Sequence, residues 1–341
     1  MADRVTGFGR TIEEFEDYEC VKTMGETYEY VASEMRNDRV VVSLFDSLDI
    51  SDGGVLFDED DELCKLDEYG YELLGKCVGI PTAYLNRLSD EMKITNIMWW
   101  FGQMRDKEVT LRVRESKLVG ASVGIEIQQA DVLRILDEQC ADWSVINIAN
   151  MTNSVQIDLV DLENAYATNC DTYSPGIRVI VRRGLNAPVI SPIFLNQDSC
   201  AIIDLGEPDD EFSIKGFSYD EILALIANRV KQCAGYCEPS FKRFCGFDET
   251  DIPKPRRRAS LYCREHGIPD RARAYVVDVF DELNITKATY GELVNIISSM
   301  PYSDGVSAST ARRFQLVAGH IMSHGPKEGR CKACDAVMLE G

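Results

Sequence analysis

The sequence predicts an α+β fold, in which a mixed or antiparallel sheet with inserted helices is followed by a C-terminal helical bundle. Val109, Leu111 and Val113 alternate with polar residues, which is the period of a strand with one buried face. Residues 155–159 repeat this alternation. From about Ser218 onward, apolar residues recur at helical spacing instead. Because the strands and helices do not alternate regularly, we do not expect a repeated βαβ unit.

Further strands and helices are expected in the first two thirds of the chain. Segments rich in β-branched residues predict strands at 40–45, 143–149, 177–182 and 200–205. Helices are expected at roughly 65–104 and 129–140. The apolar residues of the second helical stretch share one side, which is made by Val132, Ile135, Leu136 and Cys140.

The last third of the chain is predicted to form a small helical bundle. Thr289 and Glu292 have the spacing of a capping box, in which the two side chains accept hydrogen bonds from amides at the start of a helix. The apolar stripe that follows them ends at Pro301, because proline cannot continue a helix.

The chain of 341 residues is long enough for two domains. We predict an α+β core domain over residues 1–215 and a helical domain over residues 216–341, with the boundary near 210–216. The segment 251–260 carries two prolines and four basic residues, which is typical of a flexible linker.

The composition predicts a folded cytoplasmic protein. Hydrophobic residues make up 45% of the chain and charged residues 27%. No window approaches about eighteen uncharged apolar residues, and the first residues lack the layout of a signal peptide. In a reducing compartment most of the twelve cysteines should stay as buried thiols. Cys233 and Cys237, for example, fall on the apolar stripe of the helix expected from Tyr219.

Four residues near the C-terminus have the spacing of metal ligands. His320, His324, Cys331 and Cys334 form the pattern H-x3-H-x6-C-x2-C. Histidines four apart share one face of a helix, and a CxxC can hold one ion with both thiolates. Two imidazoles and two thiolates fill a tetrahedron, so we predict a structural Zn²⁺ without an open position for catalysis. The alternatives are a solvated tail with incidental cysteines and a redox CxxC.

The remaining motifs do not assemble a catalytic site. His266 precedes a glycine and a proline and is expected at a helix end, where it complements the helix dipole. There is no phosphate-binding GxxxxGK[ST] sequence. The acidic run 57–62 has no EF-hand spacing and is read as a solvated loop. Glu91 and Lys93 resemble a nuclease ExK but lie in a helical stretch. We therefore favour a non-catalytic protein.

The charges are segregated along a chain whose net charge is −21. Residues 46–72 hold eleven acidic residues and one lysine, and could meet a basic partner. Residues 251–275 are basic and are the candidate nucleic-acid surface, unless they pair with the protein's own acidic groups. The candidate contacts are Lys254, Arg256, Arg257, Arg258, Arg264, Arg271 and Arg273. Residues 99–101, Trp-Trp-Phe, could stack on bases, but their helical setting favours burial.

Several segments together resemble the phage/plasmid-like proteins that carry domain of unknown function 932. The resemblance runs over roughly residues 65–320 and depends on the order and spacing of the segments. They are 79–85, 111–122, 171–177, 289–295 and 311–319, together with a helix beginning near Gln129. The resemblance implies a mobile-element protein in the host cytoplasm, associated with DNA replication or recombination, and it implies no catalytic residues.

These observations lead to one function hypothesis and two alternatives. The first is a phage accessory protein, non-catalytic, that binds nucleic acid through its basic helical segment. The second is an acidic decoy whose residues 46–72 occupy a basic site on a host DNA-binding or defence protein. The third is a structural component of the virion.

Overall fold

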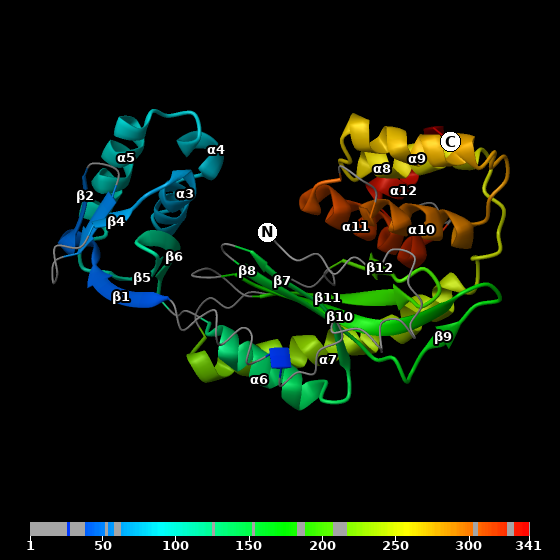
Figure 1. The fold of residues 1–341 in the computed structure, drawn as a ribbon, viewed down its shortest axis with the longest axis horizontal. Coiled ribbons are helices and arrows are strands. Elements are labelled where there is room, and N and C mark those ends of the chain that lie inside the picture. The colour runs from blue at the N-terminus through cyan, green and yellow to red at the C-terminus, as the bar shows by residue number, and fades with distance from the viewer. Residues whose placement is uncertain are drawn as a thin grey trace.

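Two six-stranded sheets and ten α-helices make up the part of the chain that this computed structural model describes (Figure 1). The described residues are 26–27, 38–51, 54–57, 63–124, 127–151, 154–182, 188–206, 217–302, 306–325 and 331–340. The α+β class is therefore confirmed, but the predicted single sheet is in fact two. Among these residues, no helix is both long and apolar enough to cross a membrane.

The N-terminal sheet closes a core of its own with three helices. Its strands, in spatial order, are β1 (Arg39–Leu44), β5 (Glu108–Arg114), β6 (Lys117–Val123), β4 (Leu63–Lys65), β3 (Gly54–Phe57) and β2 (Leu48–Ser51). Only the β4–β6 pair is parallel. A 3-10 turn, Phe45–Ser47, joins β1 to β2. The helices are α3 (Glu68–Cys77), α4 (Thr82–Leu85) and α5 (Asp90–Gln103). Val109 and Leu111 are fully buried in this core, as their alternation predicted.

The central sheet is antiparallel throughout its described strands. Its order is β12 (Ala201–Asp204), β11 (Val189–Asn196), β10 (Thr172–Arg182), β8 (Ser154–Val160) and β7 (Ser144–Met151), and β9 (Tyr166–Ala167) pairs with the start of β10. In register, Ile177 faces Leu159 and Val179 faces Ile157, so these apolar side chains share one face. The helices α6 (Gln129–Gln139) and α7 (Tyr219–Phe244) cover that face.

The helical part packs on the opposite face of the central sheet, at the β12 edge (Figure 1). It consists of α8 (Pro255–Glu265), α9 (Asp270–Glu282), α10 (Tyr290–Ser299), the 3-10 turn Met300–Tyr302, α11 (Ala308–His324) and α12 (Lys332–Glu340). The capping box at α10 is confirmed: Thr289 Oγ1 accepts from the Glu292 amide at 3.2 Å, and the Glu292 carboxylate accepts from the Thr289 amide at 2.8 Å. Cys233 and Cys237 of α7 are fully buried, as predicted.

A buried ion network ties α11 to the central sheet. The Arg178 guanidinium donates two hydrogen bonds to Asp158, at 2.7 and 2.9 Å, and one to Asp204 at 3.0 Å. It also donates to Gln315 of α11 at 2.7 Å. All three charged side chains are almost completely buried. Because each charge has hydrogen-bonded partners, the network fixes the helix against the sheet without leaving an uncompensated group.

One glycine allows α11 to come unusually close to β12. A Cβ added at Gly319 would lie 2.0 Å from the Asp204 carbonyl oxygen. Only a residue without a side chain permits this approach of helix to strand. Gly319 directly precedes His320, so the contact also positions the metal-ligand candidates of α11.

The predicted linker at 251–260 is wrong. Ile252 is buried and its amide donates to the Ala288 carbonyl at 2.8 Å. The helix α8 then begins at Pro255, because proline is well accommodated at the first position of a helix. The predicted domain boundary at 210–216 lies outside the described residues. The helix α7, which follows it in the chain, shares a core with the central sheet.

Candidate metal centre

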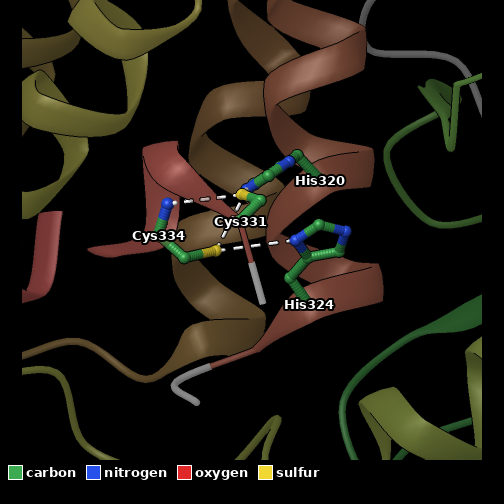
Figure 2. Close-up of side chains that lie close together, drawn as sticks. All are labelled: His320, His324, Cys331 and Cys334. Carbon is green, nitrogen blue, oxygen red and sulfur yellow. Dashed lines mark hydrogen bonds between the residues drawn. The ribbon is translucent and has the colours of Figure 1, made fainter. Parts of the chain in front are cut away.

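The four predicted ligands come together at the junction of α11 and α12. His320 and His324 lie in the last two turns of α11, four residues apart, and therefore project from the same side. Cys331 immediately precedes α12, and Cys334 lies in its first turn. Figure 2 shows the four side chains converging between the two helices. The segment 326–330 that joins them lies outside the described residues.

The possible ligand atoms of the cluster lie within 4.8 Å of one another. His320 Nε2 is 3.2 Å from Cys334 Sγ and 3.6 Å from Cys331 Sγ. His324 Nδ1 is 3.6 Å from Cys334 Sγ. Cys331 Sγ also accepts a hydrogen bond from the Cys334 amide at 3.4 Å, which fixes the turn of the CxxC. These residues could therefore bind one metal ion together.

The spacing of the ligand atoms matches a tetrahedral ion. With metal–sulfur bonds of about 2.3 Å and metal–nitrogen bonds of about 2.05 Å, a tetrahedron separates sulfur from nitrogen by about 3.6 Å. The three observed sulfur–nitrogen distances, 3.2, 3.6 and 3.6 Å, lie close to this value. A donor set of two imidazoles and two thiols is also the chemistry of a tetrahedral thiolate-imidazole site.

The surroundings keep His320 and His266 neutral. Burial, together with smaller contributions from the nearby His266 and His324 rings, lowers the pKa of His320 to about 3. Burial also lowers the pKa of His266, with a smaller contribution from His324. A neutral imidazole is the form that binds a metal, so His320 needs to lose no proton near neutral pH in order to bind one.

His266 belongs to this neighbourhood, which the sequence reasoning missed. As predicted, it is the C-cap residue of α8. Its ring, however, packs edge-on against His320 with a centroid distance of 4.5 Å, and its Nε2 is buried without a hydrogen-bond partner among the described residues. Tyr262, one turn earlier on α8, also faces His320, at 6.3 Å between ring centroids. No sequence spacing links residue 266 to residue 320, so only the packing of α8 on α11 reveals the contact.

The C-terminal helix α12, which carries Cys334 of the cluster, packs into the helical core. Cys334 and Val337 of α12 are fully buried, and α12 packs against α8. At the end of α11, Gly325 takes a φ of 65°, and a Cβ there would lie 2.6 Å from the Phe247 ring. Gly325 therefore both ends the helix and turns the chain toward α12.

The predicted basic surface is only partly available to a ligand. Arg258 is buried and donates to the Tyr290 hydroxyl at 3.1 Å. Ion pairs join Arg256 to Asp281, Arg264 to Glu265 and Arg273 to Asp270. Lys254, Arg257 and Arg271 are exposed.

The exposed cations also divide between two places. Lys254, Arg256 and Arg257 lie at the start of α8, whereas Arg264 and Arg271 lie at the turn between α8 and α9. Along α8, Arg257 and Arg264 lie seven residues apart, which separates the nearest members of the two groups by about 10 Å. The structure therefore does not gather the seven candidates into one patch.

Two other sequence expectations concern the N-terminal part. The expectation of burial holds for Phe101, which is 1% exposed, but is wrong for Trp99 and Trp100, which are 59% and 39% exposed. Glu91 and Lys93 lie in α5, as expected, and Lys93 pairs with Asp90 at 2.9 Å. Most of the acidic run 57–62 lies outside the described residues.

Comparison with known proteins found no match: no protein family, no curated protein and no solved structure is similar to this chain at a significant level. The site is therefore characterised by its own geometry.

Proposed function

We propose that the protein is a non-catalytic binding protein whose helical part is held closed by one structural zinc ion. The observation that carries this proposal is the donor set of His320, His324, Cys331 and Cys334, which supplies four ligands at tetrahedral spacing. Zinc favours this combination of nitrogen and sulfur donors. Four protein ligands leave no position for a water or substrate, so the ion would stabilise structure and not perform chemistry.

The zinc ion would add a metal link to the packing that holds the short helix α12 in the bundle. The helix α12 is only nine residues long, and isolated helices of that length are marginal in water. A metal bond from α12 to α11 would add binding free energy to folding free energy. Chelation of the ion from the purified protein, followed by limited proteolysis, tests this role. We expect cleavage after α11 to accelerate on chelation and to slow again when zinc is returned; an unchanged cleavage rate would contradict a structural ion.

For the binding function, we propose nucleic acid as the partner, as expected for an accessory protein of a mobile genetic element. Lys254, Arg256 and Arg257 support this proposal, because they are exposed together at the start of α8. The start of a helix also attracts phosphate through its free amides and its dipole. The Arg256–Asp281 ion pair is exposed on both sides, so it is weak enough to yield to a phosphate.

Comparison of two matched double variants distinguishes a phosphate contact at α8 from charge attraction spread over the surface. The double variant Arg256→Gln/Arg257→Gln should bind a short single- or double-stranded DNA more weakly. If both arginines meet phosphates, the slope of log K against log salt should become less steep by about 1.8 for double-stranded DNA and by about 1.4 for single-stranded DNA. The matched control is Arg87→Gln/Arg105→Gln, which removes the same charge from exposed positions in the N-terminal part. Equal effects of both double variants, or no DNA binding at low salt, would reject the α8 surface.

A further inference from the structure

The two cysteines of the cluster differ in their access to solvent. Cys331 is half-buried at the start of α12, whereas Cys334 is fully buried one turn later. Their sulfurs belong to a cluster whose ligand atoms lie within 4.8 Å of one another. A small backbone adjustment can therefore bring the CxxC sulfurs to bonding distance, since this short spacing is compatible with a disulfide.

The start of α12 favours reaction at Cys331. The Cys334 amide donates to Cys331 Sγ at 3.4 Å, which fixes the sulfur of the more exposed cysteine at the start of α12. Exposure decides which cysteine of the pair an oxidant reaches first.

Most other thiols of the described chain are protected. Burial raises the pKa of Cys64 to about 11 and that of Cys77, Cys140, Cys237 and Cys263 to about 12. These thiols stay protonated at neutral pH and react slowly. Among the described cysteines, Cys170 and Cys245 are exposed, and Cys77 is half-buried like Cys331. None of these three belongs to the metal cluster, so the exposed pair Cys170 and Cys245 serves as an internal control.

We propose that Cys331 and Cys334 are a peroxide-reactive pair, and that their oxidation to a disulfide releases the metal ion. This inference rests on the proposed zinc site and adds a modification site to it. The oxidant class is a hydroperoxide, with hydrogen peroxide as the simplest member.

The reaction takes place in two steps that balance. First, the Cys331 sulfur attacks one peroxide oxygen; the S–O bond forms, the O–O bond breaks, and hydroxide leaves to become water. Second, the Cys334 thiolate attacks the Cys331 sulfur; the S–S bond forms, the S–O bond breaks, and a second water results. The two thiolates lose two electrons, and the peroxide accepts them. Cys331 is the residue that reacts first with the peroxide because it is the more exposed of the pair.

Oxidation removes half of the donor set. His320 and His324 would remain, and two imidazoles alone do not retain zinc against a chelator. Release would then remove the metal link between α12 and α11, because the ion takes ligands from both ends of the cluster. Reduction of the disulfide in the presence of zinc should restore the site, so the modification is reversible.

The test uses the full zinc-loaded chain and hydrogen peroxide, with a zinc-binding dye to follow release. We expect one zinc to be released for each Cys331–Cys334 disulfide formed, with the disulfide identified by mass spectrometry of the digested protein. The variants Cys170→Ser and Cys245→Ser should release zinc at the wild-type rate. Cys331→His keeps four ligands but cannot form the disulfide, so it should hold its zinc in peroxide.

Two results separate this inference from the proposed function. A purified protein without zinc would reject the zinc site itself. A zinc-loaded protein that keeps its metal while Cys170 or Cys245 is oxidised would reject the peroxide-reactive pair and leave the zinc site standing. Release without a Cys331–Cys334 disulfide in the mass spectrum of the wild-type protein would also overturn the proposal.

Discussion

Replacement of Gly319 by alanine tests how closely α11 is held against the central sheet. The added Cβ would lie 2.0 Å from the Asp204 carbonyl oxygen, 2.5 Å from its carbonyl carbon and 2.9 Å from Leu205 Cα. Cβ contacts under 3.0 Å essentially never occur, so α11 has to move away from β12 by about 1.0 Å, the difference between 3.0 and 2.0 Å. The obstacle is backbone and cannot rotate aside.

The size of the effect follows from two opposing contributions. In a helix interior, alanine is favoured over glycine by about 0.5–1 kcal/mol. Overpacking of a buried contact costs about 1–3 kcal/mol, and a backbone obstacle places Gly319→Ala toward the upper end. The net result should be a loss of stability of about 1–2 kcal/mol. The ion network of Arg178 with Gln315 and Asp204 spans the same interface and should weaken as the helix moves.

Gly235 provides the matched control. It also lies inside a helix, α7, but a Cβ there would meet no atom within 4 Å. Gly235→Ala should therefore stabilise the protein by about 0.5–1 kcal/mol. Urea unfolding followed by circular dichroism measures both variants under the same conditions. The close approach of α11 to β12 is refuted if Gly319→Ala is as stable as Gly235→Ala.

The other predictions concern the buried network, a helix cap and the aromatic residues of α5. Arg178→Met leaves Asp158 without its cation and Asp204 with only Arg312, at 3.9 Å, and should cost about 3–5 kcal/mol in urea unfolding; a loss below about 1 kcal/mol, the range of exposed ion pairs, would contradict the buried network. Thr289→Ala removes the cap of α10 and should cost about 1 kcal/mol, and Thr289→Ser should recover most of it. Phe101→Ala should lower stability by about 3–5 kcal/mol because this ring is buried. Trp99→Ser should change it by no more than about 0.5 kcal/mol because its ring is largely exposed. Similar effects at the two aromatic positions would contradict their placement.

Local patterns predicted the site and much of the secondary structure. The four ligand candidates fall within fifteen residues, so their convergence requires only one helix end, a turn and the start of another helix. The alternation at residues 109–113 and 155–159 likewise identifies the apolar face of each strand without knowledge of the rest of the fold. The expected wet face is wrong for residues 155–159, because Asp158 on that face is buried in the ion network. Such features are encoded by neighbouring residues.

Strand β11 was not predicted from the sequence, and its proline shows why a local pattern can be misleading. Pro192 lies inside this strand, and proline in a run normally argues against a central strand. The structure accommodates it opposite Ile177 of β10, and the Pro192 carbonyl accepts from the Leu205 amide at 3.0 Å. The strand is made possible by its pairing with β10 and β12, the strands on either side of it in the chain, and the residues of the run itself do not report that pairing.

Long-range contacts explain why the linker prediction at 251–260 was wrong and why His266 was not predicted as a neighbour of the metal cluster. The segment 251–260 has the basic, proline-containing composition of a linker. Its Arg258, however, donates to the Tyr290 hydroxyl across the bundle, a contact that the local sequence does not report. His266 reaches the His320 ring only because α8 packs beside α11. In contrast, Trp99 and Trp100 are exposed because the helical stripe that enters the core contains Ile97 and Phe101 instead.

Metal analysis of the intact protein by native mass spectrometry tests the central claim most directly. The wild-type chain should carry about one zinc ion. His320→Ala and Cys334→Ser should lose it, since each removes one of four ligands. Cys245→Ser should keep it, because this exposed cysteine lies outside the cluster. A wild-type protein without zinc after purification in its presence, or a His320→Ala variant that binds zinc as tightly as the wild type, would contradict the account.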